Sequence, residues 1–151
     1  MIVLRLARRD EAEKLTDMCL RSKAVWGYDE AFMKACRTEL RICAADFDHS
    51  SLCVAVDADT VIGVAQLALD GEEAHLHKLF VEPSAIRSGA GARLLSWAIT
   101  VSRQNRAKRL WIESDPDAAD FYRKMGAIDE GFAPSGSVPG RVLPRLKISL
   151  K

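Results

Sequence analysis

Two histidines, His75 and His77, stand two residues apart in the segment AHLHKLFV. In a β-strand, side chains at this spacing leave the same face of the sheet, and Leu79 and Val81 share their parity. An imidazole with a pKa of about 6.5 accepts a proton at neutral pH, directly or through water. The pair therefore predicts a general base. Two half-exposed strand histidines, or two metal ligands, would have the same spacing.

A loop of small residues follows this apolar run. Val81 ends the run, and a helix with Leu94 and Ala98 on its buried side comes after the loop. The loop residues of interest are Arg87, Ser88, Gly89, Ala90, Gly91 and Ala92. The first amides of a helix have no intrahelical partner, and small residues let an anion reach them. The loop therefore predicts a phosphate or diphosphate site, and a tight turn without ligand is the alternative.

A third segment, LWIESDPDAADFYRKMGA (residues 110–127), combines a strand with a short helix. Asp115 is suited to cap this helix, and Gly126 is suited to end it. Phe121 and Tyr122 lie on the apolar face of the helix. A phenol with a pKa of about 10 can protonate a thiolate if it is held close. Tyr122 is therefore either a general acid or a core residue with its hydroxyl at the rim.

Expected strands and helices surround these segments. Apolar runs predict strands at 2–6, 51–56, 61–69, 74–81, 109–113 and 146–150. Apolar residues at helical spacing predict helices that begin at 11, cover 29–40, begin near 89 and begin at 116. No linker or internal repeat separates these elements. The pattern therefore predicts one α/β domain over residues 1–151.

The composition is that of an ordinary globular protein, with 48% hydrophobic residues and a net charge of +1. Binding to nucleic acid or membranes favours a strong basic excess, so neither partner is expected. No apolar run approaches the ~20 residues of a membrane span, and the N-terminal segment lacks a signal-peptide core. The four cysteines form no CxxC pair. We therefore expect reduced thiols, no metal and a cytoplasmic location.

Two segments resemble motifs of the GNAT N-acetyltransferase superfamily. Val81-x-Pro83 followed by Gly89-x-Gly91 is similar to its acetyl-CoA motif, V-x-P-x-x-[Q/R]-x-x-G-x-[G/A]. The matches to its later segment, Asn-x-x-Ala-x-x-Phe-Tyr-x-Lys-x-Gly, are in order Asp115, Ala118, Phe121, Tyr122, Lys124 and Gly126. Two positions depart from these motifs. Ile86 stands in place of Gln or Arg, with Arg87 beside it, and Asp115 stands in place of Asn.

The resemblance implies the acyl-CoA N-acyltransferase fold, a twisted and mostly antiparallel sheet of about six to seven strands flanked by about four helices. It implies that acetyl-CoA donates an acetyl group to a primary amine of a small molecule or peptide, which attacks directly in a ternary complex. Family members often pair through their C-terminal strands, which implies a homodimer. The residues that the resemblance assigns to acetyl-CoA are Leu79, Phe80, Val81, Arg87, Ser88, Gly89, Ala90, Gly91, Ala92, Asp115, Phe121 and Lys124.

The resemblance also implies roles in the reaction. The amide of Leu79 would donate to the thioester carbonyl, Val81 would hold the pantetheine arm, and Tyr122 would lie against the sulfur. The histidine pair is similar to one in arylalkylamine N-acetyltransferases, while other members have a glutamate at the position of His75. The carboxylates that remain alternative bases are Glu72, Glu73 and Glu113.

The segment SKAVWGYDEAF, residues 22–32, holds Trp26 and Tyr28 around a glycine between two expected helices. Aromatic side chains in such a place suit a mobile lid over a cationic or aromatic amine, and a packed corner is the alternative. Two other functional classes stay open. A CoA-binding regulatory module would bind without turnover. A nucleotide-binding module would need a Walker lysine or a Rossmann acidic residue, and the chain has neither at the required spacing.

Overall fold

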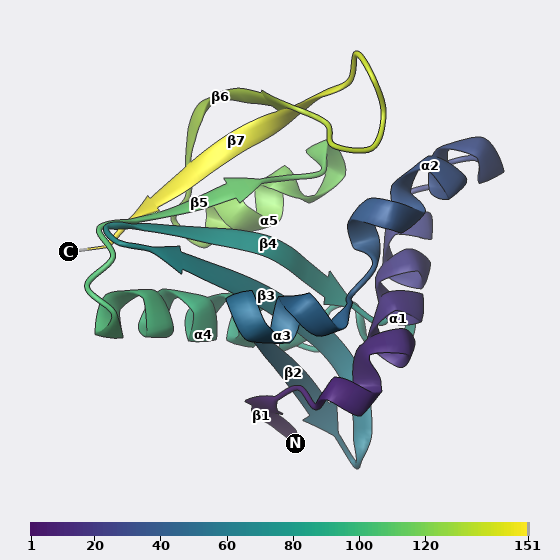
Figure 1. Ribbon diagram of the computed structural model, residues 1–151, viewed down its shortest axis with the longest axis horizontal. Helices are drawn as coiled ribbons and strands as arrows, with labels where there is room; N and C mark the ends of the chain where they lie inside the picture. The colour runs from purple at the N-terminus through teal and green to yellow at the C-terminus, as the bar shows by residue number, and fades with distance from the viewer. Residues whose placement is uncertain (151) are drawn as a thin grey trace.

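The computed structural model describes residues 1–150, which form one seven-stranded sheet with helices on both faces (Figure 1). The strands are β1 (Ile2–Leu6), β2 (Ser51–Asp57), β3 (Thr60–Asp70), β4 (Glu73–Val81), β5 (Arg109–Glu113), β6 (Ile128–Pro134) and β7 (Val142–Ser149). The helices are α1 (Ala12–Ala24), α2 (Glu30–Leu40), α3 (Ala44–His49), α4 (Ala90–Gln104) and α5 (Ala119–Lys124). Short 3-10 turns are η1 (Arg9–Glu11), η2 (Pro83–Ala85) and η3 (Pro116–Ala118).

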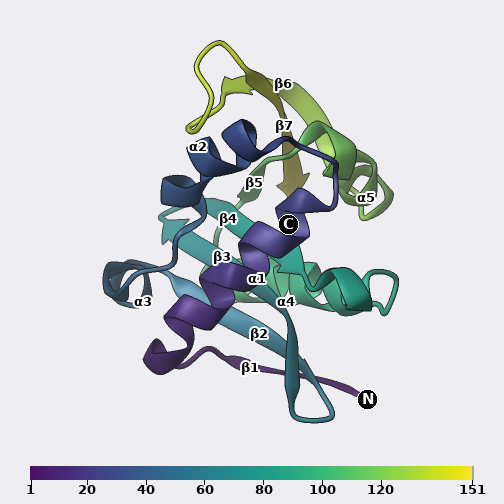
Figure 2. The ribbon, with the colours of Figure 1, turned by 90° about the vertical axis from the view of Figure 1, so that its right-hand side faces the viewer.

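The strand order is β1-β2-β3-β4-β5-β7-β6, and every neighbouring pair is antiparallel except β4–β5. This architecture confirms the expected mixed α/β fold with a mostly antiparallel sheet. Two apolar clusters lie on opposite faces. Helices α1 and α2 pack on β2 and β3 through Leu15, Cys36 and Val54, and α1 crosses in front of the sheet in Figure 2. Helices α4 and α5 pack on the other face through Leu94 and Tyr122.

Local signals explain most helix boundaries. The Asp29 carboxylate accepts the Phe32 amide at 2.8 Å and caps α2. Gly89 begins α4 with a φ of +92°, a conformation that glycine adopts without strain. Asp115 accepts the Asp117 amide at 3.0 Å, but it caps the 3-10 turn η3, which then leads into α5. The expected starts of these elements are thus confirmed to within about two residues.

Two elements have no clear signal in the sequence. Helix α3 is six residues long and begins where the Asp46 carboxylate accepts the Cys43 amide at 2.9 Å. Strand β6 has six exposed residues out of seven, so no apolar alternation marks it. It forms because β7 offers it backbone partners, for example Ile128 with Lys147. Tertiary pairing, not the local pattern, therefore accounts for β6, whereas α3 begins at a local cap.

Candidate active site

The parallel strands β4 and β5 separate after four residue pairs and leave a gap in the sheet. Pairing with β5 stops at Leu76 on β4. Beyond the end of β4, the Glu82 amide donates to the Ile62 carbonyl of β3 at 2.8 Å. Because backbone groups alternate in direction along a strand, the amides of Leu79 and Val81 face away from β3 and into the gap. The gap therefore offers main-chain donors that no neighbouring strand uses.

A β-bulge lies at the beginning of this free stretch. The pairing of β4 with β3 shifts between Leu76 and Lys78, so His77 is an extra residue without a partner. The side chains of Leu76, Leu79 and Val81 consequently pack into the same cluster, under α4. The expectation that Leu79 and Val81 share the face of the histidines is wrong. One extra residue reverses the alternation, so the histidines lie on the opposite face of the sheet.

The two histidine rings remain neighbours in spite of the bulge. Their centroids are 6.1 Å apart and their planes differ by 10°. Although His77 is exposed at the surface of the strand, partial burial of its ring lowers its pKa from 6.5, and the charges of His75 and Lys78 lower it further. The His77 imidazole is therefore neutral at pH 7 and able to accept a proton.

The carboxylates that were alternative bases differ in availability. Glu73 accepts hydrogen bonds from Arg109 at 2.6 and 2.8 Å and from the Trp111 indole at 2.9 Å, and these bonds lower its pKa to about 2. Glu72 pairs with Lys108 at 2.6 Å. Glu113 is exposed and makes no ion pair within residues 1–150. Among the three, Glu113 is the carboxylate free to act.

The glycine loop meets α5 at Gly91. A Cβ atom at this position would lie 3.5 Å from Cζ of Phe121 and 3.7 Å from Cγ2 of Val81. The first helical hydrogen bond runs from Arg93 to the Gly89 carbonyl at 3.1 Å. The amides of Gly91 and Ala92 therefore have no intrahelical acceptor. Free backbone amides at the start of a helix are suited to binding an anion such as a phosphate.

Tyr122 packs in the same apolar cluster as Ala90 and Leu94 of α4. Its residue is 7% exposed, and its ring meets Phe121 edge-on with centroids 5.2 Å apart. The hydroxyl makes no hydrogen bond within the described chain, whereas every wholly buried side-chain nitrogen or oxygen there has a partner. The oxygen consequently reaches solvent-accessible space. Burial raises the pKa of the phenol above 10, so the hydroxyl keeps its proton at neutral pH.

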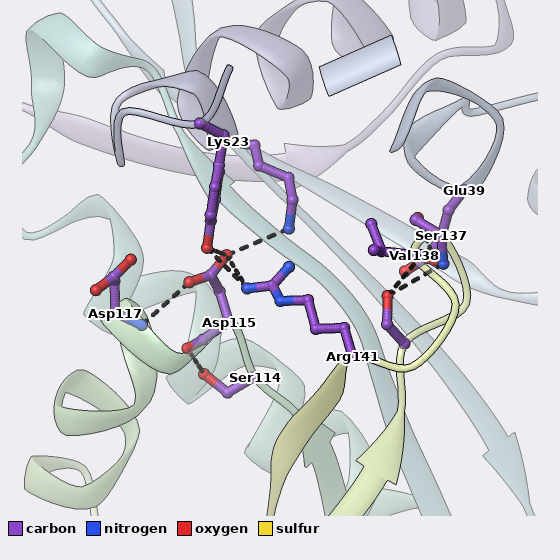
Figure 3. A network of polar contacts seen from close by, with 10 residues as sticks. Lys23, Glu39, Ser114, Asp115, Asp117, Ser137, Val138 and Arg141 are labelled. Carbon is purple, nitrogen blue, oxygen red and sulfur yellow. Dashed lines mark hydrogen bonds and ion pairs between the residues drawn. The ribbon is translucent and has the colours of Figure 1, made fainter. Parts of the chain in front are cut away.

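Asp115 lies in a cluster of polar side chains beside the gap (Figure 3). Its Oδ2 accepts a hydrogen bond from the Tyr28 hydroxyl at 2.7 Å and one from Lys23 Nζ at 3.3 Å, and Nη2 of Arg141 is 3.7 Å away. Burial opposes ionisation of Asp115, but the bonds from Tyr28 and the Asp117 amide and the charge of Lys23 lower its pKa overall. Asp115 is therefore an anion held by three segments of the chain.

Lys23 and Arg141 were not among the residues that we expected in the site. Arg141 follows the loop between β6 and β7, which lies against α2 in Figures 1 and 2, where the Ser137 hydroxyl donates to Glu39 at 2.7 Å. The guanidinium of Arg141 lies over the rings of Phe32 and Tyr28, at 4.8 and 5.2 Å from their centroids. No local pattern in the sequence signals these contacts, because they join residues more than 85 positions apart.

The other expected residues lie around these groups. Tyr28 stacks on Phe32 with centroids 4.0 Å apart, whereas Trp26 is 44% exposed outside this stack. Phe80 packs with the α1–α2 cluster. Arg87 and Lys124 are exposed and make no hydrogen bond or ion pair in the described part of the chain. No helix of residues 1–150 is long and apolar enough to cross a membrane, and no group of three potential metal ligands occurs there.

Comparison with known proteins assigns the chain to a family. The sequence model of the Acetyltransferase (GNAT) family matches residues 17–127. Peptidyl-lysine N-acetyltransferase YjaB of Salmonella typhimurium is 34% identical over 128 residues, which are 83% of each protein. The chain therefore belongs to the GNAT family and is an acetyl-CoA-dependent N-acetyltransferase.

Solved structures share the fold along the whole chain. PaiA N-acetyltransferase from Thermoplasma acidophilum, in complex with coenzyme A, superposes with a TM-score of 0.79 at 17% identity and covers 99% of both chains. A GCN5-related N-acetyltransferase from Rhodopseudomonas palustris has a TM-score of 0.81 at 18% identity, covering 98% of this chain and 95% of that one. The fold expected from the sequence is confirmed, as is acetyl-CoA as the cosubstrate.

Proposed function

We propose that the enzyme acetylates the primary amine of a lysine side chain in a peptide, or of a small molecule, by direct attack in a ternary complex. The observation that carries this proposal is the pair of free amides, Leu79 and Val81, in the gap between β4 and β5. The similarity to a peptidyl-lysine N-acetyltransferase supports the peptide acceptor. Acetyl-CoA supplies the acetyl group as a thioester.

The chain's own groups hold the cosubstrate in this proposal. The amides of Gly91 and Ala92 bind the diphosphate, with Ser88, Gly89 and Ala90 shaping the turn around it. Arg87 is an exposed cation directly before this turn, and Lys124 is an exposed cation of α5, the helix whose Phe121 lies beside Gly91. The Val81 amide binds the pantetheine arm, and the Leu79 amide donates to the acyl oxygen, where negative charge develops.

Two proton transfers complete the proposed mechanism. Neutral His77 accepts the proton of the substrate ammonium, with His75 beside it at 6.1 Å between ring centroids. The Tyr122 hydroxyl donates to the departing thiolate. No covalent acyl-enzyme is needed: Cys19, Cys36 and Cys53 are buried, and burial raises the pKa of the Cys19 and Cys53 thiols to about 12 and about 11.

Assembly and location are also part of the proposal. Strand β6 is an edge of the sheet, and apolar residues of β6 and β7 are exposed there, namely Ile128 (60%), Phe132 (72%) and Val142 (57%). These residues suit pairing of two copies into a homodimer. All four cysteines are free thiols, which supports a cytoplasmic location.

The experiment that tests the function combines binding with turnover. Acetyl-CoA and CoA are expected to raise the melting temperature of the protein, while ATP and NADH leave it unchanged. A lysine-containing peptide with a blocked N-terminus is then expected to release free CoA thiol, and the same peptide with acetylated lysine to release none. Stabilisation by CoA without thiol release from any amine would instead indicate a CoA-binding regulatory module.

A further inference from the structure

The charges around Asp115 do not balance. Lys23 and Arg141 carry two positive charges, and Asp115 is the one carboxylate within 4 Å of either cation in residues 1–150, which leaves a surplus of one positive charge. The side chain of Lys23 is 14% exposed, that of Arg141 19% and that of Asp115 11%. An uncompensated charge at this depth is costly unless a further anion binds to it.

The guanidinium of Arg141 has free N–H donors that could bind such an anion. Its Nη2 donates to the Tyr28 hydroxyl at 2.8 Å, and its 3.7 Å contact with Asp115 is too long for a hydrogen bond. Its Nε and Nη1 atoms make no hydrogen bond in the described chain, and they reach solvent-accessible space, because every wholly buried polar atom has a partner. The rings of Phe32 and Tyr28 hold the guanidinium plane in place. A rigid, planar fork with free donors matches the geometry of a carboxylate.

The position of the cluster connects it to the reacting groups. Pairing of β4 with β5 ends at Leu76 and Ile112. Leu79 lies three residues beyond the first of these, and Asp115 lies three residues beyond the second. The Asp115 cluster and the free amide of Leu79 are therefore on the two sides of the same gap.

We propose that Arg141 and Lys23 form a carboxylate-binding subsite. The enzyme then prefers an acceptor amine or an acyl-CoA that carries a carboxylate close to its reacting group. This inference rests on the proposed N-acetyltransferase function. The carboxylate belongs either to the acceptor, as in an amino acid or the C-terminal residue of a peptide, or to a dicarboxylic acyl group of the CoA thioester.

Matched substrate pairs test the subsite. Lysine is compared with cadaverine, and amino acids are compared with their amides, in kcat/KM with acetyl-CoA. Succinyl-CoA is compared with butyryl-CoA, using the neutral amide as acceptor. The carboxylate-bearing member of at least one pair is expected to be preferred by about tenfold or more. Arg141→Gln and Lys23→Gln should abolish this preference, so that the ratio of kcat/KM between the two members of the pair falls to within about twofold of one.

Controls separate recognition from folding. Arg141→Lys keeps the charge but not the fork, so it should retain part of the preference. Arg103→Gln removes an exposed arginine of α4 and should retain all of it. Equal kcat/KM within every pair for the unchanged enzyme, or a preference that survives both Gln substitutions, would overturn the subsite.

A binding measurement keeps this inference separate from the proposed function. The melting temperature in the presence of CoA is measured with lysine and with cadaverine, for the unchanged protein and for Arg141→Gln. Stabilisation by lysine alone, lost in the variant, supports the subsite even if no amine is acetylated. Equal shifts with both amines contradict a subsite for an acceptor carboxylate, and equal shifts with succinyl-CoA and butyryl-CoA as well would contradict the subsite altogether. Failure of acetyl transfer to every amine contradicts only the proposed function.

Discussion

The hydroxyl of Tyr28 donates a hydrogen bond of 2.7 Å to Asp115, across 87 residues of the chain. This contact joins the connection between α1 and α2 to the start of η3, directly after β5. Arg141 extends the contact to the strand after the β6–β7 loop through its bond to Tyr28. Three segments that surround the open end of the gap are thus fastened at one carboxylate, where the family motif has an asparagine.

Replacing Asp115 by Asn should lower the free energy of unfolding at pH 7 by about 1–2 kcal/mol, because the amide keeps the acceptor for Tyr28 but loses the attraction of two cations. The folded state lowers the pKa of Asp115, so its ionic contribution is complete above the ordinary value of 3.8 and disappears as the pH falls through the lower folded pKa. Urea unfolding of both proteins at pH 7 and pH 3 measures this difference. If the difference in unfolding free energy between the two proteins is the same at both pH values, the ionic explanation is contradicted.

Removing the Tyr122 hydroxyl should affect turnover much more than stability. The hydroxyl has no hydrogen-bond partner in the described chain, so Tyr122→Phe leaves no buried group unsatisfied and should change the unfolding free energy by less than about 0.5 kcal/mol. Loss of the proton donor should lower kcat about 10- to 100-fold, with little change in the dissociation constant of CoA. Steady-state thiol release measures kcat, and calorimetric titration with CoA measures the dissociation constant. An unchanged kcat would remove Tyr122 from the mechanism.

The pH profile should identify the general base. Only the neutral imidazole accepts a proton, so activity should fall with decreasing pH through the pKa of His77, which lies below 6.5. His77→Ala should remove this acidic limb and lower kcat/KM by about tenfold or more. His75→Ala removes a charge that lowers the pKa of His77, so the limb should move to higher pH. If neither substitution alters the limb, Glu113 becomes the next base to test.

Two glycines of the loop should respond differently to alanine. Gly89 has a φ of +92°, so Gly89→Ala should destabilise the protein by about 1 kcal/mol through backbone strain. Gly91 lacks such a φ, and an added Cβ would make an ordinary contact of 3.5 Å with Phe121. Gly91→Ala should therefore melt near the temperature of the unchanged protein and raise the KM for acetyl-CoA several-fold. An unchanged KM in Gly91→Ala would argue against diphosphate binding at this loop.

The sequence alone predicted the features that depend on neighbouring residues. The glycine at the start of α4 and the Asp115 cap after β5 act over three or four positions, so their residue types suffice to locate them. The motif spacing from Val81 to Gly91 likewise identified the family, which the comparisons confirmed.

Tertiary structure decided the features that depend on distant partners. The bulge at His77 lies where β4 stays paired with β3 but is no longer paired with β5, and the extra residue puts Leu79 on the face opposite the histidines. Lys23, in the last turn of α1, and Arg141, in a loop, carry no local signal, because a lone charged residue in either place is usually solvated. Packing of the β6–β7 loop against α2 brings Arg141 to Asp115, and the placement of α1 brings Lys23 there. Contacts made by tertiary packing leave no periodic pattern in the sequence.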